Sequence, residues 1–348
     1  MKKVVVIGGG FAGSYISRKL QNYFKVILID SKDYFEFTPG ILRTIVEPAH
    51  IKKIQILHKK YLNKAKVIIG DVKEISEKSV TVGKKMFKFD YAVICSGSNY
   101  QSPIKEQHVV IAARSQHLIN CYKNLSSAKE ILIIGGGLVG VELAAEICTH
   151  YPRKKVVIVH LHDRLMERQN IKTSKIALNF LKKHGVTVHF KEKIIKSSGR
   201  PFVSSRGKIF KSDMAFLCTG ITPNYHFLKK HFSHVLNKKN QVIVNKNLQV
   251  KDYNNIFSAG DITSVSIEKT AQNAEKQAKT VVKNIKALEK GFPISVYNSA
   301  KTPIVLSLGK FNGIFEFRNI IFSGVIPSIL KKAIELREMW RLRLSKII

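Results

Sequence analysis

Two glycine-rich stretches of the same form have the residue types and the spacing that binding a dinucleotide requires. One is Gly8-x-Gly10-x-x-Gly13 and the other is Gly135-x-Gly137-x-x-Gly140. In such a stretch the first glycine allows a tight turn, the second lets the backbone approach a pyrophosphate, and the third lets a helix pack closely on a strand. The N–H groups at the start of that helix then face the phosphates. We therefore expect the chain to bind two dinucleotides.

The residue that ends the next strand differs between the two stretches. After the first stretch it is Asp30, a carboxylate that can accept hydrogen bonds from the hydroxyls of an adenosine ribose. After the second it is His160, so no acid at that position repels a 2′-phosphate. The basic residues near it are His162, Arg164 and Lys155. These residues make NADPH plausible unless the histidines are ordinary surface residues, whereas Asp163 could bend back towards a ribose, so NADH stays open.

The elements that must position these residues form a unit that occurs twice. In each unit an apolar run leads into the glycines, residues with helical spacing follow, and a second apolar run comes next, which is the pattern strand, helix, strand. Each unit closes on another apolar strand. The runs are residues 4–7, 26–29 and 90–97 in the first unit, and 131–134, 156–159 and 213–220 in the second. Apolar strands of this kind are typical of parallel sheets. The sequence thus predicts an α/β fold of two Rossmann-like three-layer domains and a short C-terminal segment.

Shorter segments complete the units. Stretches of alternating polarity at residues 66–71, 79–82 and 186–190 predict a small antiparallel meander in each unit. After the second unit, residues 255–261 form a strand that ends in Gly260 and Asp261, and a helical stretch runs to about residue 288.

Composition limits the class of protein. The chain has 348 residues, of which 45% are hydrophobic and 24% charged, which is ordinary for a globular protein. Its four cysteines are Cys95, Cys121, Cys148 and Cys218. Their scatter indicates reduced thiols in the cytoplasm and no metal site. The formal net charge of +35 favours anionic partners, namely nucleic acid, lipid headgroups or phosphorylated substrates, or reflects solvated lysines spread along the chain. We expect no secretory signal and no membrane-spanning helix.

Five motifs in order resemble a known family. They are GGGFAG at residues 8–13, DYAVICSGS at 90–98, GGGLVGVELAAE at 135–146, DMAFLCTG at 213–220 and NNIFSAGD at 254–261. This order is similar to that of the FAD-dependent pyridine nucleotide oxidoreductases. The likeness is strongest to type II NADH:quinone dehydrogenases and to ferroptosis-suppressor (apoptosis-inducing-factor-like) quinone reductases, and it extends to about residue 320. It implies a discontinuous FAD-binding domain at residues 1–110 and 240–295, an NAD(P)H-binding domain at 111–239, and a C-terminal segment at 296–348.

The resemblance also implies a role for each site residue. The FAD site would comprise Gly8, Gly10, Gly13 and Asp30 at the ADP half, Val72 at the adenine, Ser96 and Gly97 in place of the family's Ala-Thr-Gly motif, and Gly260 and Asp261 at the ribityl chain. The NADH or NADPH site would comprise Gly135, Gly137, Gly140, His160 and Gly220.

Three further residues would take part in catalysis. Glu142 matches a family glutamate near the nicotinamide and the flavin, where it could place or discharge protons; otherwise it is an exposed helix residue. Gln272 and Gln277 belong to a stretch that resembles the AQxAxQQ motif at the quinone end of type II dehydrogenases. Lys276 replaces the first glutamine of the terminal pair, and the helix could merely pack. The implied reaction passes hydride from NAD(P)H to FAD and then two electrons to a quinone.

Cysteine positions separate the possible acceptors. Disulfide reductases of this superfamily have a CxxxxC pair shortly after the first strand–helix–strand, and residues 39–44 contain no cysteine. Sulfide:quinone reductases need a cysteine late in the chain, and none follows Cys218, so a sulfide:quinone reductase is weakly supported. The residues also leave open a ferredoxin- or rubredoxin-reductase-like enzyme and a redox sensor that binds nucleic acid.

The end of the chain predicts contact with a membrane. Residues 319–330 carry no charge, and a basic helical stretch with Trp340, Lys346 and Ile347 follows them. An apolar patch next to a basic amphipathic helix suits the interface of a membrane. We expect residues 319–348 to hold the protein peripherally on the cytoplasmic face of a membrane. The alternative is a helix that docks on the protein core or on the mate in a homodimer.

Overall fold

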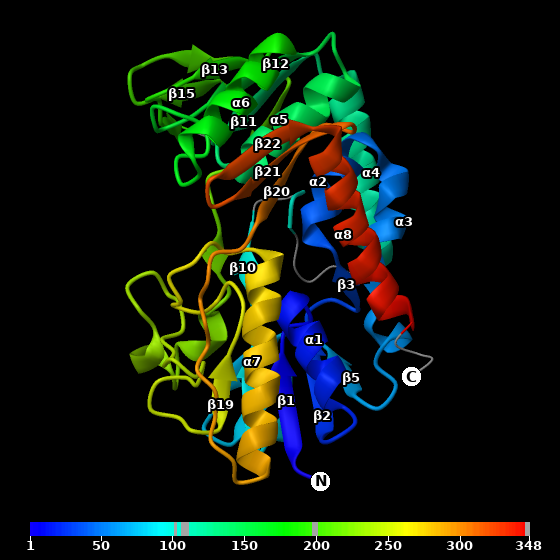
Figure 1. The fold of residues 1–348 in the computed structure, drawn as a ribbon, viewed down its shortest axis with the longest axis vertical. Helices are drawn as coiled ribbons and strands as arrows, with labels where there is room; N and C mark the ends of the chain where they lie inside the picture. Colours follow the sequence, from blue (N-terminus) through cyan, green and yellow to red (C-terminus); the bar gives the residue numbers. More distant parts are fainter. Residues whose placement is uncertain (101–102, 106–110, 197–200, 345–348) are drawn as a thin grey trace.

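The computed structural model describes residues 1–100, 103–105, 111–196 and 201–344. Figure 1 shows two α/β units at opposite ends of the long axis, with the C-terminal segment lying along both. The α/β fold class predicted from the sequence is confirmed.

The first unit is built on a five-stranded parallel sheet in the order β19-β9-β1-β2-β5. Helix α1 (Phe11–Leu20) connects β1 to β2 and packs against α7 (Ala271–Glu289), the long yellow helix of Figure 1. Valine and isoleucine fill the strands because both faces of the sheet are covered. The strands are β1 (Lys3–Ile7), β2 (Lys25–Asp30), β5 (Lys66–Ile69), β9 (Tyr91–Ile94) and β19 (Ile256–Ser258).

The second unit has a four-stranded parallel sheet in the order β13-β12-β11-β17. Helix α5 (Leu138–His150) follows β11, as α1 follows β1, and α4 (Ile111–Ser127) and α6 (Ile171–Lys183) complete the unit. The strands are β11 (Glu130–Ile134), β12 (Lys155–Val159), β13 (Thr187–His189) and β17 (Met214–Leu217). The closing strand of each unit pairs directly with its opening strand, which explains why the two motifs recur together.

Each unit carries a three-stranded antiparallel meander, but the sequence misplaced two of the three stretches assigned to them. Residues 79–82 form the middle strand of the first meander. Residues 66–71 and 186–190 instead supply β5 and β13, the edge strands of the parallel sheets. An edge strand exposes alternate side chains, so its polarity pattern resembles that of an antiparallel strand. The meander strands are β6 (Val72–Ile75), β7 (Ser79–Val82) and β8 (Lys85–Lys88), and β14 (Ile194–Lys196), β15 (Phe202–Ser204) and β16 (Ile209–Phe210).

The C-terminal segment contains a sheet that the sequence did not predict. Strands β20 (Ile304–Leu308), β21 (Asn312–Phe317) and β22 (Ile320–Gly324) pair antiparallel, and α8 (Val325–Arg343) follows. The uncharged residues 319–330 are therefore divided between a strand and the start of a helix. Lys346 and Ile347 lie outside the described residues.

Short elements connect the units. Strand β10 (Ser98–Asn99) pairs with β18 (Thr222–Pro223), which ties the loop after β9 to the loop after β17. The remaining short elements are β3 (Tyr34–Glu36), β4 (Gln55–Leu57), α2 (Ile41–Val46), α3 (Ile51–Ile54) and the 3₁₀ turns Thr38–Gly40, Pro48–His50, His58–Lys60, His226–Leu228 and Ser233–Val235. Among the described residues, no helix is long and apolar enough to cross a membrane.

Candidate functional site

The first glycine loop joins β1 to α1 and leaves open space beside its second glycine. Gly8 has a φ of 97°, and a Cβ atom built on it would lie 2.3 Å from the carbonyl oxygen of Cys95. Only glycine lets β1 turn this close to the end of β9. A Cβ on Gly13 would collide with the carbonyl of Gly8, whereas a Cβ on Gly10 would meet no atom within 4 Å. The backbone at Gly10 is thus open to a ligand.

Asp30 ends β2 beside this loop, and a histidine holds its carboxylate. His58 Nε2 lies 2.9 Å from Asp30 Oδ2, and His58 Nδ1 lies 2.7 Å from the Tyr61 hydroxyl. His58 and Tyr61 are fully buried. Burial tends to raise the pKa of Asp30, but the hydrogen bond and charge of His58 outweigh it, and the pKa is lowered. The N–H of Gly70 donates to the carbonyl of Asp30 at 2.8 Å, which brings the start of β6 at Val72 to this end of the sheet.

The second glycine loop repeats this geometry between β11 and α5. Gly135 has a φ of 110°, and its Cβ would lie 2.3 Å from the carbonyl oxygen at the end of β17. A Cβ on Gly140 would collide with Gly135, and a Cβ on Gly137 would meet nothing within 4 Å. His160 follows β12 and accepts a hydrogen bond from the N–H of Gly136 on Nδ1 at 3.0 Å. Both loops therefore have a cradle for a pyrophosphate.

The residues after the closing strands join the two units. Ser96 Oγ donates to the carbonyl of Asn224 and Asn224 Nδ2 donates to the carbonyl of Ser96, both at 2.8 Å. Gly97 and Gly220 turn the chain with φ values of 64° and 112°. The predicted residues Ser96, Gly97 and Gly220 thus lie at the junction between the units.

A cavity of about 360 Å³ lies between the two units and α8. It contacts the start of α1, the start of α5, the start of α7 and the inner face of α8. Of the residues singled out in the sequence, Gly10, Gly97, Glu142, Gly260, Asp261 and Gln272 line it. Its apolar wall includes Phe11, Phe37, Leu42, Ile304, Leu306 and Ile334. The helix that follows the first glycine loop and the helix that follows the second therefore line the same cavity.

Asp261 projects into this cavity after β19. Ser98 Oγ donates to Asp261 Oδ2 at 2.7 Å, and Lys105 Nζ lies 3.9 Å from the same oxygen. Burial lowers the pKa of Lys105, while the charge of Asp261 acts to raise it. The sequence predicted Asp261 but not its two partners: Ser98 ends the motif at residues 90–98 without a role of its own, and Lys105 lies outside the motifs.

The two glutamines of α7 have different environments. Gln272 lines the cavity, next to the start of the helix. Gln277 is 1% exposed, and its Oε1 accepts the N–H of Gly260 at 2.7 Å. Thr270 caps the helix by accepting the N–H of Asn273 at 3.3 Å. Gln277 therefore supports the loop that carries Asp261, and Gln272 is the glutamine placed to meet a ligand.

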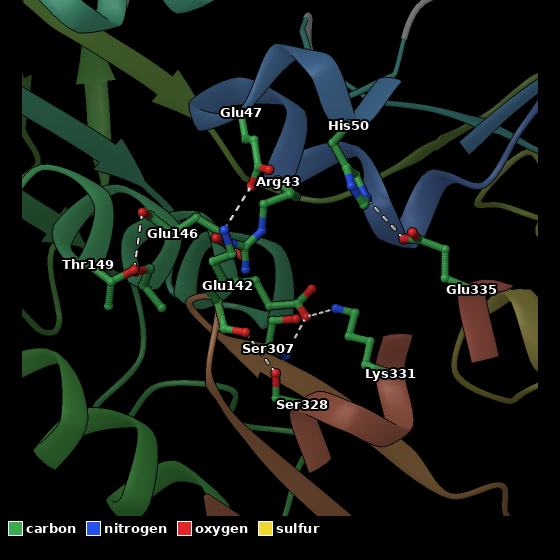
Figure 2. A network of polar contacts seen from close by, with 12 residues as sticks. Arg43, Glu47, His50, Glu142, Glu146, Thr149, Ser307, Ser328, Lys331 and Glu335 are labelled. Atoms are coloured by element: carbon green, nitrogen blue, oxygen red, sulfur yellow. Dashed lines mark hydrogen bonds and ion pairs between the residues drawn. The ribbon is translucent and has the colours of Figure 1, made fainter. Parts of the chain in front are cut away.

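Glu142 lies on the cavity wall and is clamped by the C-terminal segment. Figure 2 shows its carboxylate between Ser307 of β20 and Lys331 of α8. The N–H of Ser307 donates to Glu142 Oε1 at 2.8 Å, and Lys331 Nζ pairs with the same oxygen. The Glu142 side chain is only 12% exposed, so it is not an ordinary surface residue. No sequence motif predicted that Ser307 or Lys331 would contact Glu142, since both residues lie more than 160 positions downstream of it.

Glu146, one helical turn after Glu142, lines a second cavity of about 330 Å³ that Glu142 and Lys331 also line. Arg43 Nη2 pairs with Glu146 Oε1 at 2.8 Å, and Glu146 Oε2 has no hydrogen-bond partner among the described residues. Burial raises the pKa of Glu146 to about 7 despite the charges of Arg43 and Lys331. The polar cluster of Figure 2 thus contains a carboxyl that exchanges its proton near neutral pH.

The four cysteines are all buried. Burial raises the pKa of Cys95 and Cys218, the latter to about 12. Such thiols are not nucleophiles at neutral pH. Among the described residues, no group of His, Cys, Asp or Glu could hold a metal ion.

The residues present fit two dinucleotides. Each glycine loop is open at its second glycine, and the first lies beside the fixed carboxylate of Asp30. The chamber between the loops has room for the reacting end of a bound cofactor.

Comparison with protein families gives one match that covers most of the chain. The model of the family described as pyridine nucleotide-disulphide oxidoreductase matches residues 2–278. Apoptosis-inducing factor homolog B of Dictyostelium discoideum is 34% identical over 95% of this chain and 94% of that protein. Ferroptosis suppressor protein 1 of Homo sapiens is 28% identical over 94% of this chain and 92% of that protein.

Solved structures share the fold over nearly the whole chain. The sulfide:quinone oxidoreductase of Aquifex aeolicus has a TM-score of 0.84 at 19% identity, covering 99% of this chain and 92% of that one. NDH2 of Plasmodium falciparum, solved with NADH, has a TM-score of 0.83 at 14% identity, covering 99% and 96%. At these identities the likeness concerns the fold alone.

Proposed function

Because the chain belongs to the pyridine nucleotide-disulphide oxidoreductase family, we propose that it is an NAD(P)H:quinone oxidoreductase that works at a membrane surface. Its cofactors are FAD and NAD(P)H, and its general activity is NAD(P)H-dependent flavoprotein oxidoreduction. The first glycine loop and Asp30 would bind the ADP half of FAD, and Asp261 would hold the ribityl chain. The second loop would bind the nicotinamide nucleotide.

The cavity of about 360 Å³ between the units is the observation that carries this proposal. Its walls come from both glycine-loop helices and from α8. Bound there, FAD supplies a two-electron carrier between a donor and an acceptor. The apolar wall, with Phe37, Ile304 and Ile334, suits the ring of a quinone better than a charged acceptor. A sulfide:quinone oxidoreductase is among the solved structures that share this fold. Sulfide itself is a poor substrate here, because the four cysteines are buried.

The proton balance of quinone reduction gives Glu142 a role. A hydride carries two electrons and one proton, whereas a quinone takes up two electrons and two protons. One proton per turnover must therefore come from water. Glu142 lines both cavities, and its carboxylate is held by Lys331 and Ser307 at the wall that an acceptor would meet. We assign Glu142 to the delivery of this proton.

Helix α8 supports the membrane part of the proposal because many of its exposed side chains are apolar. Several side chains that face the protein are polar: Ser328, Lys331 and Glu335 contact Lys310, Glu142 and His50. The apolar Met339 and Leu342 are buried as well. Most of the side chains left exposed are apolar, with Ile326 at 69%, Ile329 at 58% and Trp340 at 64%. The basic Lys332, Arg337 and Arg343 are exposed among them. Phe311, in the turn between β20 and β21, adds to this surface, because Lys332 of α8 lies over its ring. Such a surface suits anionic lipid.

Anaerobic mixing of the purified protein tests the catalytic proposal. Addition of NADH or NADPH should bleach the flavin absorbance near 450 nm, and a short-chain quinone should restore it. Absence of bleaching with either nucleotide would refute the assignment as an NAD(P)H-dependent flavoprotein. Bleaching that quinone does not reverse would refute quinone as the acceptor and favour a protein acceptor, such as a ferredoxin.

A further inference from the structure

The ends of β2 and β12 are equivalent positions in the two units. Gly8 donates its N–H to the carbonyl just before Asp30 at 2.7 Å, and Gly135 donates its N–H to the carbonyl just before His160 at 2.8 Å. His160 therefore stands beside the second glycine loop where Asp30 stands beside the first. Residues at this position contact the adenosine ribose of a bound dinucleotide.

A carboxylate and an imidazole meet at both positions, with their places exchanged. In the first unit Asp30 is at the strand end and His58 lies behind it at 2.9 Å. In the second unit His160 is at the strand end, and its Nε2 lies 3.4 Å from Glu167 Oε2. The second unit has no acid at the end of β12, but Glu167, seven residues after His160, places a carboxylate beside that position.

The loop between β12 and α6 folds back on the glycine loop and fixes the position of Glu167. The N–H of Met166 donates to the carbonyl of Gly136 at 2.9 Å. Leu165 packs so closely that a Cβ on Gly136 would lie 2.5 Å from its Cδ2. Leu165 and Met166 are buried, whereas the side chain of Glu167, the next residue, is 31% exposed and remains accessible to a ligand.

The basic residues that made NADPH plausible do not form a phosphate site. Lys155 lies at the opposite end of β12, where its Nζ pairs with Glu130 at 2.8 Å. The guanidinium of Arg164 donates to the main-chain carbonyls of Gln169 and Glu167.

Two histidines and one arginine remain near the carboxylate. His160 accepts the N–H of Gly136 on Nδ1, so a neutral ring carries its proton on the Nε2 that faces Glu167. Burial lowers the pKa of His160, which keeps it uncharged at neutral pH. His162 and Arg168 lie 3.8 and 4.0 Å from the carboxylate of Glu167. A 2′-phosphate could therefore pair with His162 and Arg168 only if it displaced the carboxylate of Glu167 from both side chains.

We infer that Glu167 selects NADH over NADPH. Its carboxylate accepts hydrogen bonds from the adenosine ribose hydroxyls and repels a 2′-phosphate. This inference rests on the use of a nicotinamide nucleotide, and it does not depend on which acceptor the enzyme reduces.

Binding and flavin reduction test the inference separately. Calorimetry with the FAD-loaded protein gives the dissociation constants of ADP-ribose and of 2′-phospho-ADP-ribose, which carry the ribose without the nicotinamide. Stopped-flow mixing gives the rate of flavin bleaching by NADH and by NADPH. The wild type should prefer the unphosphorylated ligand by about tenfold or more, since two like charges this close repel strongly at a protein surface. Glu167→Gln should reduce this preference about tenfold, and Glu167→Lys should reverse it.

Asp163→Asn is the matched control, because Asp163 is an exposed acid of the same loop and its removal changes the charge equally. The control should keep the wild-type preference. Equal preference in the wild type, an unchanged preference in Glu167→Gln, or an equal loss in Asp163→Asn would overturn the inference. Preferential binding of ADP-ribose without flavin bleaching by either nucleotide would support the selectivity while refuting the proposed activity.

Discussion

The free energy of unfolding should depend on pH through Glu146, and the substitution Glu146→Gln should remove that dependence. Burial raises the pKa of this carboxyl from 4.5 to about 7, against the opposing charges of Arg43 and Lys331 and with support from the like charge of Glu142. The side chain is 3% exposed, so solvent screens the effect little. Each pKa unit corresponds to about 1.4 kcal/mol, and the shift therefore amounts to roughly 3 kcal/mol.

The sign follows from where the proton is bound. Between pH 4.5 and about 7 the folded chain keeps a proton on Glu146 that the unfolded chain has released. The free energy of unfolding then falls as pH rises, by about 1.4 kcal/mol per unit. This contribution is complete below pH 4.5 and is lost once the pH has passed about 7.

Urea unfolding followed by circular dichroism at pH 5, 6, 7 and 8 measures the effect as the difference between wild type and Glu146→Gln. Other titrating groups cancel in this difference because both proteins contain them. The wild-type value should fall by roughly 3 kcal/mol relative to the variant between pH 5 and 8. Glu77→Gln removes an exposed carboxyl and should run parallel to the wild type. Parallel curves for the wild type and Glu146→Gln would refute our account of the buried carboxyl.

Two further predictions concern the reaction and the membrane. Glu142→Gln should slow quinone reduction about 100-fold, because a general acid contributes about this much. Reduction of ferricyanide, which takes up no proton, should stay close to the wild-type rate. Equal slowing with both acceptors in steady-state assays would contradict proton delivery by Glu142. Ile326→Glu combined with Ile329→Glu should release the protein from phosphatidylserine vesicles in a flotation assay. Ile171→Glu, which changes an isoleucine of α6 that is 56% exposed, should leave binding intact, and retention of the double variant would argue against α8 as the membrane surface.

Local patterns in the sequence predicted the parts of the fold that depend on local chemistry. The glycine loops, their strands and Asp30 could be placed because a tight turn and an apolar strand leave a pattern within ten residues. The edge strands β5 and β13 were misassigned, since exposure at an edge alternates as it does in an antiparallel strand. The sheet of residues 304–324 was missed because its short strands show no clean alternation, as the half-buried residues of β20 and β21 illustrate.

Partners that come from distant segments could not be predicted. His58, Lys331 and Ser307 each hold a site carboxylate, yet nothing near them in the sequence marks such a role. The contacts of α8 with the protein could not be predicted for a related reason. Lys331 and Glu335 pair with Glu142 and His50, which lie far away in the sequence.

Helix α8 would connect the proposed membrane surface to the proposed reacting groups. Lys331 reaches inward to Glu142, and Ile329 and Leu330, which precede it, are exposed on the outside. A lipid bound to the outer face would therefore stabilise the same helix that fixes the carboxylate of Glu142. Because Lys331 and Ile334 also line the cavity, an acceptor that leaves the lipid would meet the site at this helix. Helix α8 buries few apolar residues, and its contacts with Glu142 and with the cavity give it a place in the site.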